Sequence, residues 1–164
     1  KLIERAGVGK HGYGSITAVY TVLAEGDDKT DPIVDIARAS LDGQVMLSRD
    51  LADAAHYPAI DMEGSISRVM ESIVEPSHLE NANKLRRLWT LYKQNQDLIQ
   101  VGAYESGSNS DLDLAITLRK EVEDLLQQNS SEAFSMDTCR GLLEEVLGDD
   151  YAVSYTHLTL PTRS

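Results

Sequence analysis

Apolar residues recur at steps of three, four and seven between residues 77 and 101, and polar residues fill most positions between them. This spacing aligns the apolar side chains on one face of a helix, so it predicts an amphipathic α-helix over residues 77–101. Ser77 and Glu80 have the spacing of a capping box, which predicts that the helix begins there. The apolar stripe consists of Leu79, Ala82, Leu85, Leu88, Trp89, Tyr92 and Ile99.

The same pattern predicts two further helices. Ser110 with Asp113 caps the first of them, and Ser135 opens the second, which Gly148 is expected to end. Polar loops separate the three helices, so residues 76–152 are predicted to form a small all-helical subdomain. The residues expected to face its core are Leu112, Ala115, Ile116, Leu118, Val122, Leu125 and Leu126 in the first of these helices, and Leu142, Leu143 and Val146 in the second.

Residues 153–164 do not continue this pattern, because they have neither a helical period nor capping residues. The string resembles the translated read-through of a sequencing adapter. We therefore interpret it as a foreign tail and leave it out of the fold prediction.

The first half of the chain has a different pattern, which indicates an α/β arrangement. Residues 15–24 are dense in β-branched and apolar side chains, which predicts a strand buried on both faces. A helix over 33–40 with Pro32 at its first position, a strand over 45–47 and a helix over 49–55 are predicted to follow. Residues 1–75 are therefore expected to be the last part of a larger sheet domain.

Composition narrows the possible functions of the 164-residue chain. Its formal net charge of −12 argues against a nucleic-acid surface, which depends on concentrated Lys and Arg. Cys139 is the only cysteine and the four histidines are scattered, so no disulfide and no metal site is expected within the chain. No apolar run approaches the ~20 residues of a membrane span. The first residues, Lys-Leu-Ile-Glu-Arg, contain neither an initiator Met nor a signal-peptide h-region, so we expect an internal fragment of a cytoplasmic protein.

One glycine-rich segment imitates a phosphate-binding loop. Gly7-Val8-Gly9-Lys10 resembles the end of that motif, but Glu4 replaces its first glycine and His11 replaces its Ser or Thr. Without these residues the segment cannot cradle phosphates, and we interpret it as a mobile connection.

Residues 56–70 form a polar loop that holds two candidate functional side chains. Tyr57 precedes Pro58, whose ring disfavours helix at the residue before it. Arg68 follows two serine hydroxyls, and an arginine in such a loop can present a planar fork to phosphate oxygens. On chemistry alone, a solvated surface arginine is the simpler interpretation of Arg68.

The segment 27–32 is an acidic loop that carries Asp27, Asp28 and Asp31. Three carboxylates could bind a hard cation, but their spacing is not that of a regular Ca²⁺ loop. An exposed loop in which Asp31 caps the following helix is the simpler interpretation.

Five segments together resemble a known family. They are Gly-Ser-Ile-Thr (14–17), Glu-Gly-Asp-Asp-Lys-Thr-Asp-Pro (25–32), Leu-Asp-Gly-Gln-Val-Met-Leu-Ser-Arg (41–49), His-Tyr-Pro-Ala-Ile-Asp (56–61) and Ser-Ile-Ser-Arg-Val-Met (65–70). In this order they resemble the C-terminal part of the flagellar and type III secretion export ATPases, within the rotary ATPase α/β-subunit superfamily. The resemblance covers about residues 1–148. It implies an α/β fold in which the C-terminal part of a RecA-like P-loop ATPase core precedes a small helical C-terminal subdomain.

The resemblance also implies roles for individual residues. Arg68 matches the arginine finger that reaches the γ-phosphate held by the adjacent subunit, and Tyr57 matches the aromatic that stacks on adenine. Phe134 lies where the helical domain of the family lends a second aromatic. Asp27, Asp28 and Asp31 match a loop that contacts a coiled-coil central stalk protein.

The expected cofactor is ATP with Mg²⁺, whose ligands lie mostly before residue 1, so this chain alone is expected to be inactive. The resemblance further implies a homohexamer that meets export chaperone–cargo complexes, in the cytoplasm or at the inner face of the inner membrane. Two alternatives stay open. One is the catalytic subunit of an ion-translocating F/V-type ATP synthase, and the other is a helical docking module for chaperones or cargo without chemistry of its own.

Overall fold

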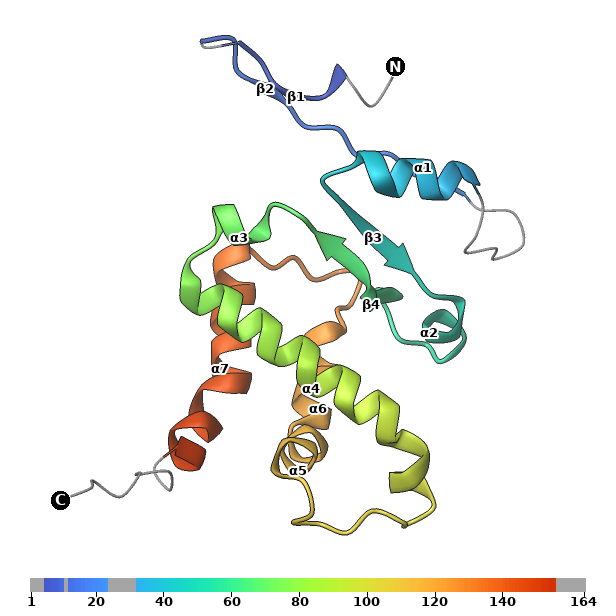
Figure 1. Cartoon of the computed structure of the whole chain (residues 1–164), viewed down its shortest axis with the longest axis vertical. Coiled ribbons are helices and arrows are strands. Elements are labelled where there is room, and N and C mark those ends of the chain that lie inside the picture. Colours follow the sequence, from blue (N-terminus) through green and yellow to red (C-terminus); the bar gives the residue numbers. More distant parts are fainter. Residues whose placement is uncertain (1–4, 11, 24–31, 156–164) are drawn as a thin grey trace, which may run out of the picture. The chain divides into compact units, whose positions relative to one another are not determined.

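The computed structural model describes residues 5–10, 12–23 and 32–155 (Figure 1). They divide into two units, which are treated separately below. The first unit contains the described residues up to Gln44 together with Ser67–Val69, and the second contains Val45–Ile66 and the chain from Met70 onward.

The first unit opens with a short antiparallel hairpin of β1 (Gly7–Val8) and β2 (Ser15–Ile16). Gly7 and Val8 of the glycine-rich segment thus belong to β1, and the Gly9 N–H that follows them donates a hydrogen bond of 2.8 Å to the Gly14 carbonyl. The prediction of a doubly buried strand over residues 15–24 was wrong. Strand pairing stops at Ile16, and Val19 is 93% exposed, because no other described strand pairs with this segment.

Helix α1 (Pro32–Ser40) follows in the first unit, before β3 (Gly43–Leu47) begins. Its first residue is the proline that the sequence predicts at this place, where the missing N–H is not needed for an intrahelical hydrogen bond. The predicted strand at 45–47 is confirmed as part of β3.

In the second unit, α2 (Arg49–Asp53) follows β3 and leads to β4 (Ile60–Ser67) and the one-turn helix α3 (Met70–Ile73). Strands β3 and β4 form a two-stranded sheet, and Figure 1 shows them running in opposite directions. The hydroxyl oxygen of Ser48 accepts the Leu51 N–H and so caps α2.

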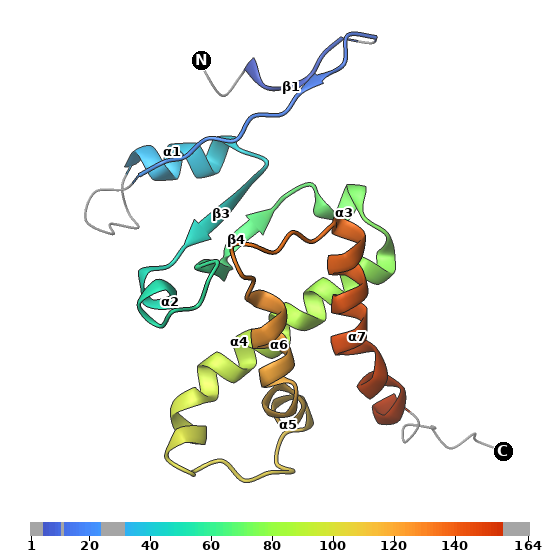
Figure 2. The ribbon, with the colours of Figure 1, turned by 180° about the vertical axis from the view of Figure 1, so that it is seen from behind.

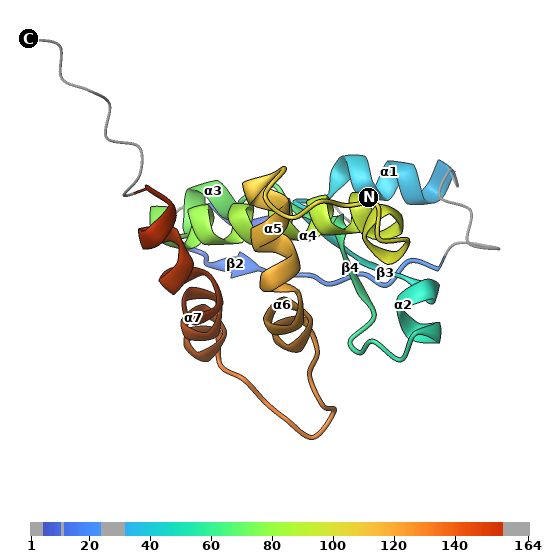
Figure 3. The same cartoon turned by 90° about the horizontal axis from the view of Figure 1, so that it is seen from below.

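The remainder of the second unit is helical. It consists of α4 (Pro76–Gln100), α5 (Ser110–Thr117), α6 (Arg119–Leu126) and α7 (Met136–Tyr155). Helix α4 crosses the other three, which pack against it (Figure 2). Viewed from below, α6 and α7 lie side by side (Figure 3). None of the helices in the described ranges is both long and apolar enough to cross a membrane.

All residues that are buried in the described part of the chain belong to this helical region. The α4 stripe supplies four of them, and the three later helices supply the rest together with Leu118, which joins α5 to α6. No charged or polar residue is buried among them. The predicted face of α4 is thus confirmed. The buried set is Leu85, Leu88, Trp89, Tyr92, Leu112, Ala115, Leu118, Val122, Leu143 and Leu147.

Two cations cover the aromatic residues of this core. Lys93 Nζ lies 5.2 Å from the centre of the Trp89 ring, and the Arg119 guanidinium carbon lies 5.2 Å from that of Tyr92. Such cation–π contacts contribute about 0.5–1 kcal/mol at exposed sites. The hydrogen bond from Arg119 to Glu123 raises the pKa of the guanidinium above its ordinary value, so it stays charged at every physiological pH.

The helices differ from the sequence prediction at several points. The helix predicted to start at Ser110 and to include Leu126 is divided at Leu118 into α5 and α6, and α2 ends at Asp53 rather than at residue 55. Helix α4 begins at Pro76 with Glu75 as its N-cap, so the capping box at Ser77 was wrong; a proline favours the first helical position. Asn109 rather than Ser110 caps α5. Helix α7 continues through Gly148 to Tyr155, and its most buried residue is Leu147. A glycine inside a helix costs only about 1 kcal/mol, which the burial of the neighbouring leucine offsets.

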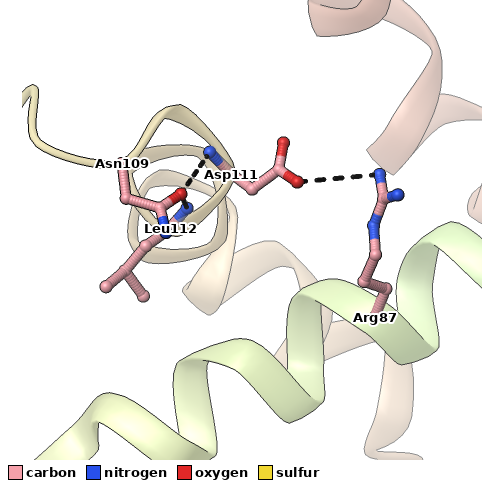
Figure 4. Close-up of polar contacts among 4 residues, drawn as sticks. All are labelled: Arg87, Asn109, Asp111 and Leu112. Carbon is pink, nitrogen blue, oxygen red and sulfur yellow. Dashed lines mark hydrogen bonds and ion pairs between the residues drawn. The ribbon is translucent and has the colours of Figure 1, made fainter.

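Figure 4 shows how α5 starts beside α4. Asn109 Oδ1 accepts the N–H groups of Asp111 at 3.0 Å and Leu112 at 3.1 Å, two donors that have no partner within the helix. The carboxylate of Asp111 lies 4.0 Å from Arg87 Nη2 on α4. This exposed ion pair is long and adds little stability, so the cap and the buried stripe hold α5 in place.

Helices α2 and α4 end in the same hydrogen-bonded turn, a Schellman motif. After α4, Gly102 has a φ of +69°, its N–H donates to the Ile99 carbonyl, and the Ala103 N–H donates to the Leu98 carbonyl. After α2 the equivalent left-handed residue is Ala55, with a φ of +57°. A side chain in this conformation costs about 1–2 kcal/mol, which glycine avoids. The turn after α2 is therefore strained.

We expect Leu88→Ala to lower the free energy of unfolding of the helical region by about 3 kcal/mol, because Leu88 is 2% exposed and its loss leaves a cavity. Leu98→Ala on the same helix is the matched control. Leu98 is 50% exposed, so its loss should cost less than about 1 kcal/mol. Urea denaturation followed by circular dichroism measures both, and equal losses would contradict the assignment of the core.

The two Schellman turns predict opposite effects of exchanging alanine and glycine. Ala55→Gly should raise the free energy of unfolding by about 1 kcal/mol, and Gly102→Ala should lower it by a similar amount, since only Gly102 already avoids the left-handed penalty. Thermal unfolding midpoints of the two variants test this pair. A fall in the midpoint of Ala55→Gly would show that the turn after α2 is not strained.

Candidate functional site

Tyr57 lies directly after the strained turn that ends α2. The turn is closed by the His56 N–H, which donates to the Leu51 carbonyl at 2.8 Å, and by the Ala55 N–H, which donates to the Ala52 carbonyl at 3.0 Å. The chain then leaves the helix axis, and Tyr57 and Pro58 lie outside any helix or strand. The non-helical conformation that Pro58 predicts for Tyr57 is confirmed.

The Tyr57 side chain is 56% exposed, so packing alone does not hold it. Its hydroxyl donates a hydrogen bond of 3.3 Å to the Ala52 carbonyl on α2. Its own carbonyl accepts the Gln128 N–H at 3.0 Å. Tyr57 is therefore held by its neighbours on α2 and by a segment far along the sequence.

An open hollow of about 550 Å³ lies beside Tyr57. Tyr57 and Pro58 form an apolar part of its lining, and the segment after α6 forms a polar part. The hollow is open to solvent, so a ligand there would lie against one aromatic face and a few polar groups rather than be enclosed. The full lining is Tyr57, Pro58, Gln128, Asn129, Ser130 and Glu132.

The polar part of the lining is a turn held closed by its own hydrogen bonds. Gln128 Nε2 donates to the Glu132 carbonyl at 2.8 Å, and the Asn129 N–H donates to Glu132 Oε2 at 2.9 Å. The Ser131 hydroxyl bonds Asn129 Oδ1 at 3.1 Å. Sequence reasoning missed this turn, since a run of Asn, Ser and Glu after a helix resembles any solvated loop.

Phe134 follows the turn and is 46% exposed. It is not among the residues that line the hollow. The structure thus brings Tyr57 together with residues 128–132, whereas the role of Phe134 as a second aromatic stays a prediction.

Arg68 belongs to the first unit and lies at the exposed end of β4. Its N–H donates to the Asp42 carbonyl at 2.8 Å, and its Nη2 donates to the Arg38 carbonyl at 3.2 Å. Arg38 is in the last turn of α1, where carbonyl oxygens lack partners within the helix and attract cations. The Arg68 guanidinium is therefore exposed to solvent and donates to an uncharged acceptor, the Arg38 carbonyl.

In the second unit, the β4 segment that precedes Arg68 is held by side-chain hydrogen bonds. Asp61 Oδ1 accepts the N–H groups of Glu63 and Gly64, both at 3.0 Å. The Ser65 hydroxyl donates to the Asp61 carbonyl and accepts the Met46 N–H, and Arg86 Nη2 donates to the Ser65 carbonyl at 2.9 Å. The Ser65 hydroxyl, one of the two that precede Arg68, thus joins β4 to β3.

The remaining predicted contacts concern the stalk and metal ions. Asp27, Asp28 and Asp31 lie outside the described residues. Within the described ranges, no three His, Cys, Asp or Glu side chains are grouped as a metal site requires. These residues do not fit a Mg²⁺ site, so no catalytic step is assigned to one here.

The two halves of the chain match two different family models. Residues 1–67 match the nucleotide-binding domain of the ATP synthase alpha/beta family, and residues 74–145 match the C-terminal domain of the EscN ATPase of type III secretion systems. The flagellum-specific ATP synthase of Pseudomonas aeruginosa is 50% identical over 152 residues, which are 93% of this chain and 34% of that protein. The chain spans about a third of the length of the curated relatives it matches.

Two solved structures are similar over most of the chain. The assembled ATPase EscN from the enteropathogenic E. coli type III secretion system has a TM-score of 0.79 and 41% identity, over 81% of this chain and 32% of that one. EscN in complex with its central stalk EscO has a TM-score of 0.80 and 40% identity, over 89% of this chain and 34% of that one.

These similarities confirm the predicted fold class, an α/β ATPase core segment followed by a helical C-terminal part. The agreement extends over both halves, since each matches its own family model in the expected order. The chain belongs to the ATP synthase alpha/beta family, in the branch of the flagellum-specific ATP synthases and type III secretion ATPases.

Proposed function

We propose that this chain is the C-terminal part of a homohexameric ATPase that hydrolyses ATP to energise type III protein export. The observation that carries the proposal is the hollow beside Tyr57, in a chain that matches a nucleotide-binding domain. An exposed aromatic ring on the wall of a hollow is suited to stack on a flat base, and such stacking contributes about 1–3 kcal/mol. Tyr57 is the residue proposed to take the adenine of ATP.

Arg68 is proposed to act as the arginine finger on ATP bound by the adjacent subunit. Its guanidinium is exposed, and its hydrogen bond within the described residues is one of 3.2 Å to a neutral carbonyl, which a phosphate oxygen of higher charge can replace. Charge spreads over the phosphoryl oxygens in the transition state, and a forked guanidinium stabilises it there. Tyr57 and Arg68 are thus proposed to serve two different sites of the ring.

The proposed partners follow from the relatives. EscN has been solved as an assembly and with its central stalk EscO, which supports a ring and a stalk partner for this chain. Asp27, Asp28 and Asp31 are the proposed stalk contacts, and the helical region is proposed to meet export chaperone–cargo complexes. The proposed location is the cytoplasm, at the inner face of the export apparatus.

The flagellar branch is the preferred assignment. Identity is 50% with the flagellum-specific protein of P. aeruginosa and 41% with EscN. The alternative, a catalytic subunit of an F/V-type ATP synthase, is less well supported because the C-terminal half matches the type III secretion family.

In the full-length protein, we expect Arg68→Ala to lower kcat by roughly 10³-fold or more while the Kd for ATP stays nearly unchanged, because the finger acts on the transition state. Arg68→Lys should recover little, since an ammonium lacks the planar fork. Steady-state phosphate release and equilibrium binding give the two quantities. Near-normal turnover of Arg68→Ala would remove this residue from catalysis.

We expect Tyr57→Ala to raise the Kd for ATP by about 5- to 100-fold, through loss of the stack on the base. Tyr57→Phe is the matched control, because it keeps the ring and loses only the hydrogen bond of 3.3 Å to the Ala52 carbonyl. Its Kd should stay within about threefold of the parent value. Titration with a fluorescent ATP analogue measures both, and an unchanged Kd for Tyr57→Ala would exclude the adenine role.

A further inference from the structure

We propose that the 128–132 turn positions Tyr57 for the nucleotide, and that Glu132 is the positioning residue that keeps this turn closed. This role rests on the proposed function of Tyr57, and it gives residues 128–132 a part in nucleotide binding. It concerns the binding of ATP rather than the chemical step.

The turn contacts Tyr57 through the main chain. The Gln128 N–H donates to the Tyr57 carbonyl at 3.0 Å, so the position of the carbonyl depends on where the turn holds residue 128. The Tyr57 ring is 56% exposed and has little packing to fix it. Its only other described hydrogen bond is that of 3.3 Å from its hydroxyl to Ala52. Losing the Gln128 contact would therefore leave Tyr57 held from the α2 side alone.

Glu132 closes the turn on both of its sides. Its carboxylate accepts the Asn129 N–H at 2.9 Å, and its carbonyl accepts Gln128 Nε2 at 2.8 Å. The Glu132 N–H also donates to the Asn129 carbonyl at 3.0 Å. Of these three bonds, only the first is made by the Glu132 side chain, and hydrogen bonds to a charged acceptor are stronger than neutral ones. The carboxylate is thus the part of Glu132 that a substitution can remove while its main-chain bonds stay possible.

A closed turn lowers the cost of binding because Tyr57 is already in place when the ligand arrives. If loss of the carboxylate leaves the turn formed in about a tenth of the molecules, the apparent Kd rises about tenfold. The rate of the chemical step at saturation is expected to stay the same, since neither Glu132 nor the Tyr57 ring is proposed to act on the phosphates.

If Glu132 acted only through its negative charge, its removal would lower the Kd for ATP instead of raising it. Glu132 lines the hollow, and removing a negative charge from a site for an anionic nucleotide would tighten binding. Glu132→Gln separates the two effects, because it removes the charge and keeps an oxygen that can accept the Asn129 N–H.

The experiment uses the full-length protein and a fluorescent ATP analogue as the probe. We expect Glu132→Ala to raise both the Kd and the KM for ATP about tenfold with kcat within twofold, and Glu132→Gln to restore most of the affinity. Glu144→Ala, which removes an exposed carboxylate on α7, is the matched control and should bind as the parent does. Glu132 is exposed, so its variants should keep the parent's unfolding midpoint.

A double-mutant cycle with Tyr57 decides whether the turn acts through that residue. In a Tyr57→Ala background, Glu132→Ala should cause no further loss of affinity. Additive losses, or parental affinity of Glu132→Ala while Tyr57→Ala binds weakly, would overturn the inference and leave the proposed function intact. Parental affinity of Tyr57→Ala would overturn both.

Discussion

The burial of one apolar stripe on α4 is the interaction on which the rest of the described structure depends. Every buried residue of the described ranges lies in the region from α4 to α7, and the segments before α4 contribute none. Because hydrophobic burial is the main favourable term in folding, this cluster must supply most of the stability of the second unit. The hollow beside Tyr57 gains its polar wall from the same region, since residues 128–132 directly follow α6.

The two candidate residues are positioned by contacts of different range. Arg68 relies on carbonyls of its own unit, at Asp42 and Arg38, and keeps an exposed guanidinium. Tyr57 relies on a local turn with a left-handed alanine and on one hydrogen bond to Gln128. A hollow whose wall is built in this way is sensitive to the conformation of the helical region.

Periodicity was sufficient to predict the helical region because a stripe such as Leu85, Leu88 and Tyr92 records which face is buried. It failed at the helix ends. Helix α4 begins at Pro76 rather than at the predicted cap Ser77, and Asn109 rather than Ser110 caps α5. Residues 15–23 have a strand composition, but among the described strands only β1 pairs with this segment, and the pairing stops at Ile16. Tyr57 and Arg68 were found by resemblance, whereas the contact with Gln128 is long-range and leaves no signal in local sequence.

The hydrogen bond between Tyr57 and Gln128 also has a consequence for biosynthesis. During translation Tyr57 is synthesised well before Gln128. The Tyr57 carbonyl therefore cannot accept the Gln128 N–H until α4, α5 and α6 have also been synthesised. Contacts of high sequence separation form late, since the loop between them must close first. The nascent chain therefore completes the wall of its hollow only when most of the helical region exists, and a prematurely terminated chain lacks that wall.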